Sequence, residues 1–242
     1  MKISNQMRNC IFNLKNHINY NINMSMNSLI INKSGQQILL ANDYGFWTFN
    51  KMLNDIDSIF TLLLEIDNIQ FKYLDPILTL ERGVLEKYAD SINFSQYRNY
   101  EIYLDYLNMK SNGDFIDDEF IKHINLHFDV DYINRKTRYY LLQRSTRQLK
   151  LPDTVEKFND RLFDLDRELS PKVHNNIPKI LNNNCDIIVF LLCEVSIMLQ
   201  QGLESMMYYL NLVEIQTFIE IKRGCENIRL LVSNRNVFEP YF

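Results

Sequence analysis

Glycine is scarce in this chain of 242 residues: there are 6, where an average usage of about 7% would give roughly 17. Rossmann sheets, phosphate-cradling loops, propellers and sandwiches all use glycine for tight turns and close backbone approach, so its scarcity argues against them. No linker rich in proline, glycine or serine interrupts the chain. Since 46% of the residues are apolar, the chain can bury a large core. These features indicate a helical protein.

Long apolar runs and paired cysteines are also missing. The longest apolar run, Ile187 to Cys193, is far shorter than the ~20 residues that span a bilayer, and no apolar segment typical of a secretory signal follows the N-terminus. We therefore expect a cytoplasmic protein with free thiols, no cofactor and no membrane partner. The four cysteines have neither CxxC nor metal-ligand spacing; they are Cys10, Cys185, Cys193 and Cys225.

Apolar residues recur at steps of three and four from residue 43 onward, the period of helices packed on a core. We expect Ser170-Pro171 to end one helix and begin another, because serine is a favoured N-cap and proline a favoured first helical residue. The longest apolar helix is expected to be the central one. The pattern predicts helices over about 43–63, 76–92, 100–109, 117–131, 135–149, 155–169, 186–210 and 212–232.

The predicted fold class is therefore all-α. We expect a single helical bundle over residues 43–242 and a less regular N-terminal arm over residues 1–42. Within the arm, residues 11–22 carry isoleucine and leucine at helical spacing, whereas residues 29–40 could instead form a small hairpin around Lys33-Ser34-Gly35.

Charge is distributed unevenly. Residues 51–131 hold sixteen acidic and seven basic residues, whereas residues 132–150 hold six basic and no acidic residues. Tyr139 and Tyr140 lie among these cations, a combination that favours phosphate contact with base stacking. The segment is a candidate nucleic-acid-binding site, or else a solvated helix face opposite the acidic helices. Its candidate contacts are Arg135, Lys136, Arg138, Arg144 and Arg147.

A second candidate site lies around His174. If a helix begins at Ser170-Pro171, His174 falls in or just after its first turn, where free backbone N–H groups favour anions. A histidine there can exchange a proton with a phosphate ester near neutral pH, and Arg167 can stabilise the developing charge. Alternatively, Arg167 pairs with Asp164 or Glu168, and His174 caps a backbone carbonyl.

Two further pairs have helical spacing. Arg82 and Glu86 flank an apolar helix stripe and could orient a site at the mouth of the bundle, or form an ordinary ion pair. His123 and His127 have the HxxxH spacing of a metal site. Because the glutamate of HExxH and the repeated ExxH of di-metal bundles are absent, we expect no metal there.

Two segments in order, ERGVLEKYAD (Glu81–Asp90) and LFDLDRELSPKVHNN (Leu162–Asn176), resemble a group of uncharacterised bacterial helical proteins. In that group an R-x-x-x-E helix precedes a Y-x-x-L-S-x-x-V-H-like segment, and the group is similar to the HEPN superfamily of nucleotide-binding helical domains. The resemblance covers roughly residues 43–210. It implies a bundle of four to five core helices that is commonly dimeric. Many members are metal-independent ribonucleases in toxin–antitoxin, abortive-infection or other antiviral systems.

The HEPN site is an arginine followed, after four to six residues, by a histidine, which Arg167 and His174 match. The resemblance implies attack by a ribose 2′-hydroxyl, with His174 moving the proton and Arg167 or Arg82 stabilising the phosphorane. Glu86 and Ser170 complete the candidate catalytic set.

Glu168 and Pro171 depart from the HEPN pattern, and many relatives bind without cleaving. We expect a HEPN-like ribonuclease or RNA-binding component of a bacterial defence or toxin–antitoxin system, as a homodimer or with an antitoxin or other protein partner. The alternative is a non-catalytic helical protein–protein interaction module.

Overall fold

A computed structural model of the protein describes residues 2–20, 29–33, 35–65, 74–97, 99–149, 153–173, 184–210 and 216–239. In this part of the chain there are nine α-helices, one short 3-10 helix and a two-stranded hairpin, which confirms the all-α fold class. In chain order the elements are α1 (Asn5–Tyr20), β1 (Ile30–Lys33), β2 (Gln36–Leu39), η2 (Leu40–Asn42), α2 (Tyr44–Glu65), α3 (Leu74–Gln96), α4 (Glu101–Asn112), α5 (Asp118–Phe128), α6 (Thr137–Leu149), α7 (Asp153–Val173), α8 (Asn184–Leu210) and α9 (Gln216–Ser233).

Helix α3 lies at the centre of the bundle. It packs against α2, α6, α7 and α8, whereas the main partners of α8 are α2, α3 and α9. The expectation that α8 is the central helix is therefore wrong. Apolar content alone favours α8 as the central helix. The apolar content of α3 is lower because α3 buries polar residues, such as Glu81, Ser91 and Asn93, together with its apolar stripe.

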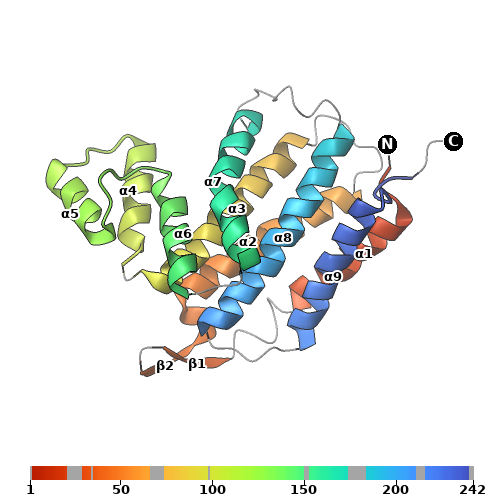
Figure 1. The fold of residues 1–242 in the computed structure, drawn as a ribbon, viewed down its shortest axis with the longest axis horizontal. Coiled ribbons are helices and arrows are strands. Elements are labelled where there is room, and N and C mark those ends of the chain that lie inside the picture. The colour runs from red at the N-terminus through yellow and green to blue at the C-terminus, as the bar shows by residue number, and fades with distance from the viewer. Residues whose placement is uncertain are drawn as a thin grey trace.

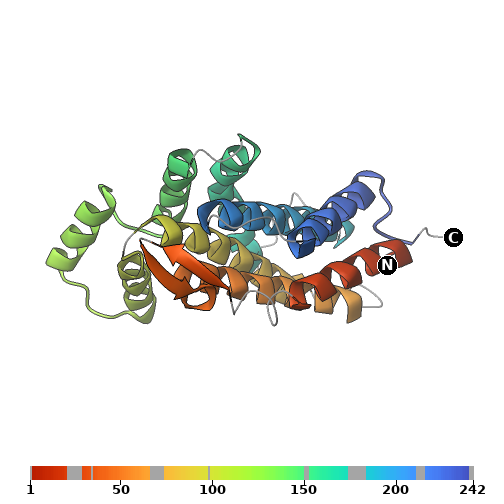
Figure 2. The ribbon, with the colours of Figure 1, turned by 90° about the horizontal axis from the view of Figure 1, so that it is seen from below.

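The molecule is elongated, with α4 and α5 at one end and both chain termini at the other (Figures 1 and 2). The terminal segments pair directly: Ile3 and Phe238 form an antiparallel β-bridge, and the backbone N–H of Ser4 donates to the carbonyl of Val237 at 2.9 Å. This pairing holds α1 beside α9, where the two helices pack together.

The first 42 residues contain both of the structures that the sequence left as alternatives. In α1, Met7, Ile11, Leu14 and Ile18 are completely buried against the main core. The hairpin pairs β1 with β2 in antiparallel register, and Gly35 takes a positive φ of 79° in the turn. The helical stripe thus makes α1 part of the bundle.

Helix α8 is the one described helix that is long and apolar enough to cross a membrane by length and composition, over Cys185–Met207. Of the most apolar window of this helix, 67% is buried inside the protein. This burial is typical of the core helix of a soluble protein.

A second, smaller apolar cluster joins α4, α5 and the start of α6. Its aromatic rings pack edge to face, with Tyr100 and Tyr103 both against Phe128. The cluster includes residues of the segment between α5 and α6 and of α6 itself, so it packs this segment and the start of α6 against α4 and α5.

Candidate nucleic-acid interface

Arg82 and Glu86 form the i,i+4 ion pair that their spacing predicts, with 3.4 Å between Arg82 Nε and Glu86 Oε1. The same Nε lies 3.4 Å from Asp166 Oδ1 of α7, and only 15% of the Arg82 side chain is exposed. Arg82 therefore joins α3 to α7, and its charge is balanced by two carboxylates.

Two cations of the basic segment enter the same network. Arg135 Nη2 lies 3.1 Å from Glu86 Oε1 and 2.7 Å from Asp166 Oδ1. Arg138 Nε lies 2.7 Å from Asp90 Oδ1, and Arg138 Nη1 lies 3.5 Å from Glu86 Oε2. We call this set of three arginines and three carboxylates the charge network; it consists of Arg82, Glu86, Asp90, Arg135, Arg138 and Asp166.

Tyrosine hydroxyls surround the charge network. Tyr100 donates to Asp90 Oδ1 at 2.8 Å, and the backbone N–H of Arg138 donates to the Tyr103 hydroxyl at 3.1 Å. Burial raises the pKa of Glu86 above its ordinary value, although Arg138 lowers it, and burial raises the pKa of Tyr100 well above its ordinary value. The network has equal numbers of opposite charges and joins α3, α6 and α7. Arg138, 7% exposed, is out of reach of a phosphate, whereas the Arg135 side chain remains 40% exposed.

Arg167 lies on the outer face of α7, where 71% of its side chain is exposed and its Nη2 lies 3.3 Å from Asp164 Oδ1. It does not join the charge network. Ser170 lies in the last turn of the same helix, and His174 lies outside the described residues. The structure thus brings Arg82 and Glu86 together, whereas Arg167 has a different partner.

The helix boundary expected at Ser170-Pro171 is wrong, because α7 continues through Pro171 to Val173. Proline in the last turn removes only one backbone hydrogen bond, and Leu165 and Leu169 keep this part of α7 packed on the core. Residues 170–173 are therefore the C-terminal end of a helix, where the dipole disfavours anions, and not the anion-favouring N-terminus that the sequence suggested.

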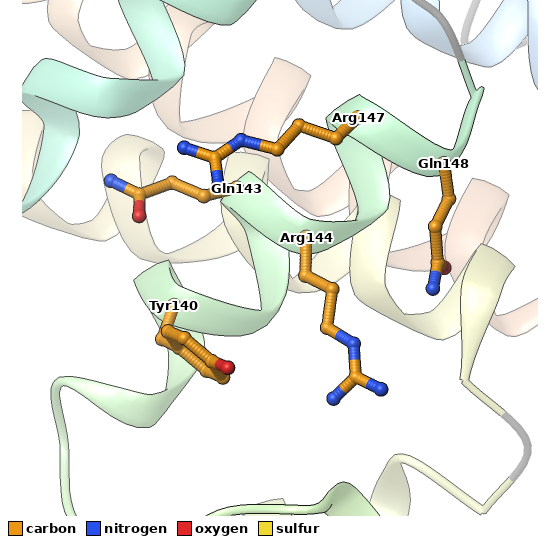
Figure 3. A pocket seen from close by; sticks show the side chains of 5 residues that line it. All are labelled: Tyr140, Gln143, Arg144, Arg147 and Gln148. Carbon is orange, nitrogen blue, oxygen red and sulfur yellow. The ribbon is translucent and has the colours of Figure 1, made fainter.

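The outward face of α6 carries the remaining cations of the basic segment. Tyr140, Gln143, Arg144, Arg147 and Gln148 line a pocket of about 260 Å³, which we call the α6 pocket. Figure 3 shows Tyr140 and Arg144 projecting to one side of α6, while Arg147 extends back along the helix toward Gln143. None of the five lining residues is acidic.

The ion pairs of the two arginines of the α6 pocket lie at the protein surface. Arg144 Nη2 lies 3.4 Å from Asp129 Oδ2, whose side chain is largely exposed, and Arg144 Nη1 donates to the carbonyl of Phe128 at 3.2 Å. Arg147 Nε lies 3.4 Å from Glu156 Oε1. Exposed pairs of this kind contribute about 0–1 kcal/mol, so a phosphate can replace the carboxylates at little cost.

A larger pocket of about 540 Å³ lies beside the first and shares Tyr140 with it. We call it the loop pocket, because most of its lining comes from the segment between α5 and α6. Lys136, a sequence candidate for phosphate contact, belongs to this pocket, with its Nζ 4.8 Å above the ring centre of Phe163. The charged, amide and aromatic side chains of its lining are Asp129, Asp131, Tyr132, Asn134, Lys136 and Tyr140.

Sequence reasoning missed Gln143 and Gln148 of the α6 pocket and Tyr132, Asn134 and the aspartates of the loop pocket. The α6 pocket does have a signal in the sequence: from Tyr140 its residues fall at i+3, i+4, i+7 and i+8, the spacing of a helix stripe made of polar side chains. The loop pocket has no such period, because its residues meet through a turn.

His123 and His127 are exposed on α5, with 6.3 Å between their ring centres. Among the described residues there is no group of three or more histidine, cysteine, aspartate or glutamate side chains that could hold a metal ion.

No protein-family model, curated protein or solved structure matches this chain.

Proposed function

We propose that this protein binds single-stranded RNA along the outward face of α6. The observation that carries the proposal is the α6 pocket, an open pocket lined by an exposed tyrosine, two arginines and two glutamines and by no carboxylate. An unpaired base stacks on a tyrosine ring, arginine binds the phosphate, and glutamine amides can hydrogen-bond base edges.

The charge of the whole chain supports a short, local contact rather than a broad one. The formal net charge is −4, and Asp129 and Glu156 pair with the arginines of the α6 pocket. A duplex would lay many phosphates across acidic neighbours, whereas a single strand needs to reach only the pocket. The half-exposed Tyr140 also suits a single strand, because only unpaired bases can stack on a side chain in this way.

The resemblance of Glu81–Asp90 and Leu162–Asn176 to HEPN proteins supports an RNA ligand and a cytoplasmic role in a bacterial defence or toxin–antitoxin system. Cleavage is a further step of the same proposal and requires His174. We expect RNA cleavage in the presence of EDTA by the wild type and its loss in His174→Ala. If both proteins cleave equally, the cleavage does not depend on His174 and the proposed catalytic role of this residue is wrong; if neither cleaves, the role is binding alone.

Binding is tested with a fluorescently labelled RNA of about eight nucleotides, within the range of single-strand site sizes. We expect Arg144→Ala and Arg147→Ala each to weaken binding several-fold, and Tyr140→Ala to weaken it about ten-fold through lost stacking. Arg223→Ala is the matched control, because Arg223 is an exposed arginine of α9 whose Nη1 lies 3.1 Å from Glu220 Oε1. Equal losses in the control and the α6 variants would contradict the proposal.

A protein–protein interaction role is the second candidate, and exposed apolar side chains near the N-terminus favour it. Ile30 and Leu39 lie opposite each other in the hairpin, and both are exposed; so is Phe12 of α1. Trp47, the single tryptophan, is half-exposed on α2 shortly after the hairpin, so its emission reports on burial of this region. A blue shift with rising protein concentration, abolished in Ile30→Ser/Leu39→Ser, would show that a second copy covers the hairpin.

A further inference from the structure

The loop pocket and the α6 pocket share Tyr140, so one ligand can extend across both. Small-molecule sites have volumes of about 300–1,000 Å³. The loop pocket, at about 540 Å³, falls within this range, whereas the α6 pocket, at about 260 Å³, lies below it. The loop pocket therefore has room for a base and its ribose, and the α6 pocket, with two arginines, suits the adjoining phosphates.

Two exposed tyrosines supply stacking surfaces for such a base. Tyr132 is 65% exposed and Tyr140 is 50% exposed, although both line the loop pocket. Exposed aromatic rings leave apolar surface in contact with water. A planar ligand that covers both rings removes this surface from water and adds stacking energy.

The polar lining of the loop pocket favours hydrogen-bond donors on the ligand. Asp129 and Asp131 both line it, and ionised carboxylates can only accept hydrogen bonds. Asp129 faces Arg144 across 3.4 Å. Among the described residues no ion pair engages the Asp131 carboxylate, although its backbone carbonyl accepts from Asn125 Nδ2 at 3.3 Å.

The bases differ in what they offer to a carboxylate. The Watson–Crick edge of guanine presents two adjacent donors, N1–H and the N2 amino group, which match the two oxygens of one carboxylate. Uracil presents a single N3–H between two carbonyl oxygens, and those oxygens would be repelled. Inosine keeps N1–H and lacks the N2 amino group, so it can form only the first of the two hydrogen bonds. The difference between guanine and inosine therefore measures the hydrogen bond from N2.

We propose that the loop pocket is a guanine subsite, in which Tyr132 and Tyr140 stack on the base and Asp131 accepts hydrogen bonds from N1–H and N2. This inference rests on the proposed RNA binding at the α6 pocket, because the phosphates held by Arg144 and Arg147 bring the base to the loop pocket.

The test uses labelled RNAs of about eight nucleotides that differ at one position in an oligouridine background, with guanine, inosine or uracil at that position. We expect the wild type to bind the guanine RNA about ten-fold more tightly than the uracil RNA, toward the low end for a bidentate base contact, with inosine between them. Asp131→Asn should reduce the guanine preference to about two-fold or less, and Asp114→Asn, an exposed aspartate in the loop before α5, should keep it.

The outcomes separate the two proposals. If the RNAs bind with dependence on Arg144 and Arg147 but without base preference, or if Asp131→Asn keeps the full preference, the guanine subsite is wrong and the RNA-binding function stands. If none of the RNAs binds, both proposals fail. Circular dichroism of Asp131→Asn, whose side chain is exposed, checks that the fold is retained.

Discussion

Asp90 of α3 and Arg138 of α6 form a buried ion pair, with 2.7 Å between Asp90 Oδ1 and Arg138 Nε. Tyr100 donates its hydroxyl hydrogen to the same carboxylate oxygen at 2.8 Å. Removing one partner of a buried ion pair leaves an uncompensated charge away from water, which is far more costly than losing an exposed pair. This contact therefore joins α3 to α6 and determines which cations of the basic segment face inward.

Asp90→Ala should lower the free energy of unfolding by about 3–5 kcal/mol, because the buried Arg138 loses the nearer of its two carboxylates and the Tyr100 hydroxyl loses its acceptor. Urea unfolding at neutral pH measures the change. The control is Arg167→Ala, which removes an exposed i,i+3 pair on α7 and should change stability by at most about 0.5 kcal/mol. Similar losses in the two variants would show that the ion pair is not a buried one.

Gly45→Ala should destabilise the protein by about 1–3 kcal/mol through overpacking, again by urea unfolding. A Cβ at Gly45 would lie 2.8 Å from the backbone carbonyl oxygen of Ser91, which cannot move without shifting α3 against α2. Gly224→Ala is the comparison, because its Cβ would first meet the flexible end of Leu14 at 2.9 Å. We expect a clearly smaller loss there, and the reverse order would contradict this account.

Cys225 should make the protein less stable at alkaline pH. Burial raises the pKa of its thiol from about 9 to about 12. The contribution of this thiol to the free energy of unfolding is fully present below its pKa in the unfolded state. It is lost as pH rises toward its pKa in the folded state, because over that range the unfolded thiol ionises and the folded one does not. Between pH 7 and pH 10 the loss is about 1–2 kcal/mol. Urea unfolding of Cys225→Val should show a loss smaller by that amount, and an identical pH dependence would refute the prediction.

The affinity for single-stranded RNA should fall with salt because phosphate contacts release counterions. Two contacts, from Arg144 and Arg147, give a slope of log K against log salt of about −1.4. Each single alanine variant should reduce this slope by about half, whereas Tyr140→Ala should weaken binding with the slope unchanged, because stacking releases no counterions. Fluorescence anisotropy titrations at several salt concentrations measure all four slopes. A slope that stays the same in Arg144→Ala would remove that residue from the interface.

The amino-acid sequence by itself determined the elements of this fold. Helix periods are local, so the recurrence of apolar residues at steps of three and four predicted α2 to α9. Gly113, directly after α4, takes a left-handed φ of 76°, as a glycine that ends a helix does. The end of α7 is the exception: packing of Leu165 and Leu169 carries the helix past Pro171, and this packing depends on neighbouring helices.

Only the tertiary structure decided which candidate residues face a ligand. Arg138 and Arg144 belong to one basic segment and look alike in the sequence. Arg138 faces inward because Asp90, 48 residues away, lies beside it in the bundle, whereas Arg144 faces a largely exposed aspartate at the surface. Ion pairs form between residues that are close in space. The helix period of a single segment gives no information about which residues of other helices lie beside it.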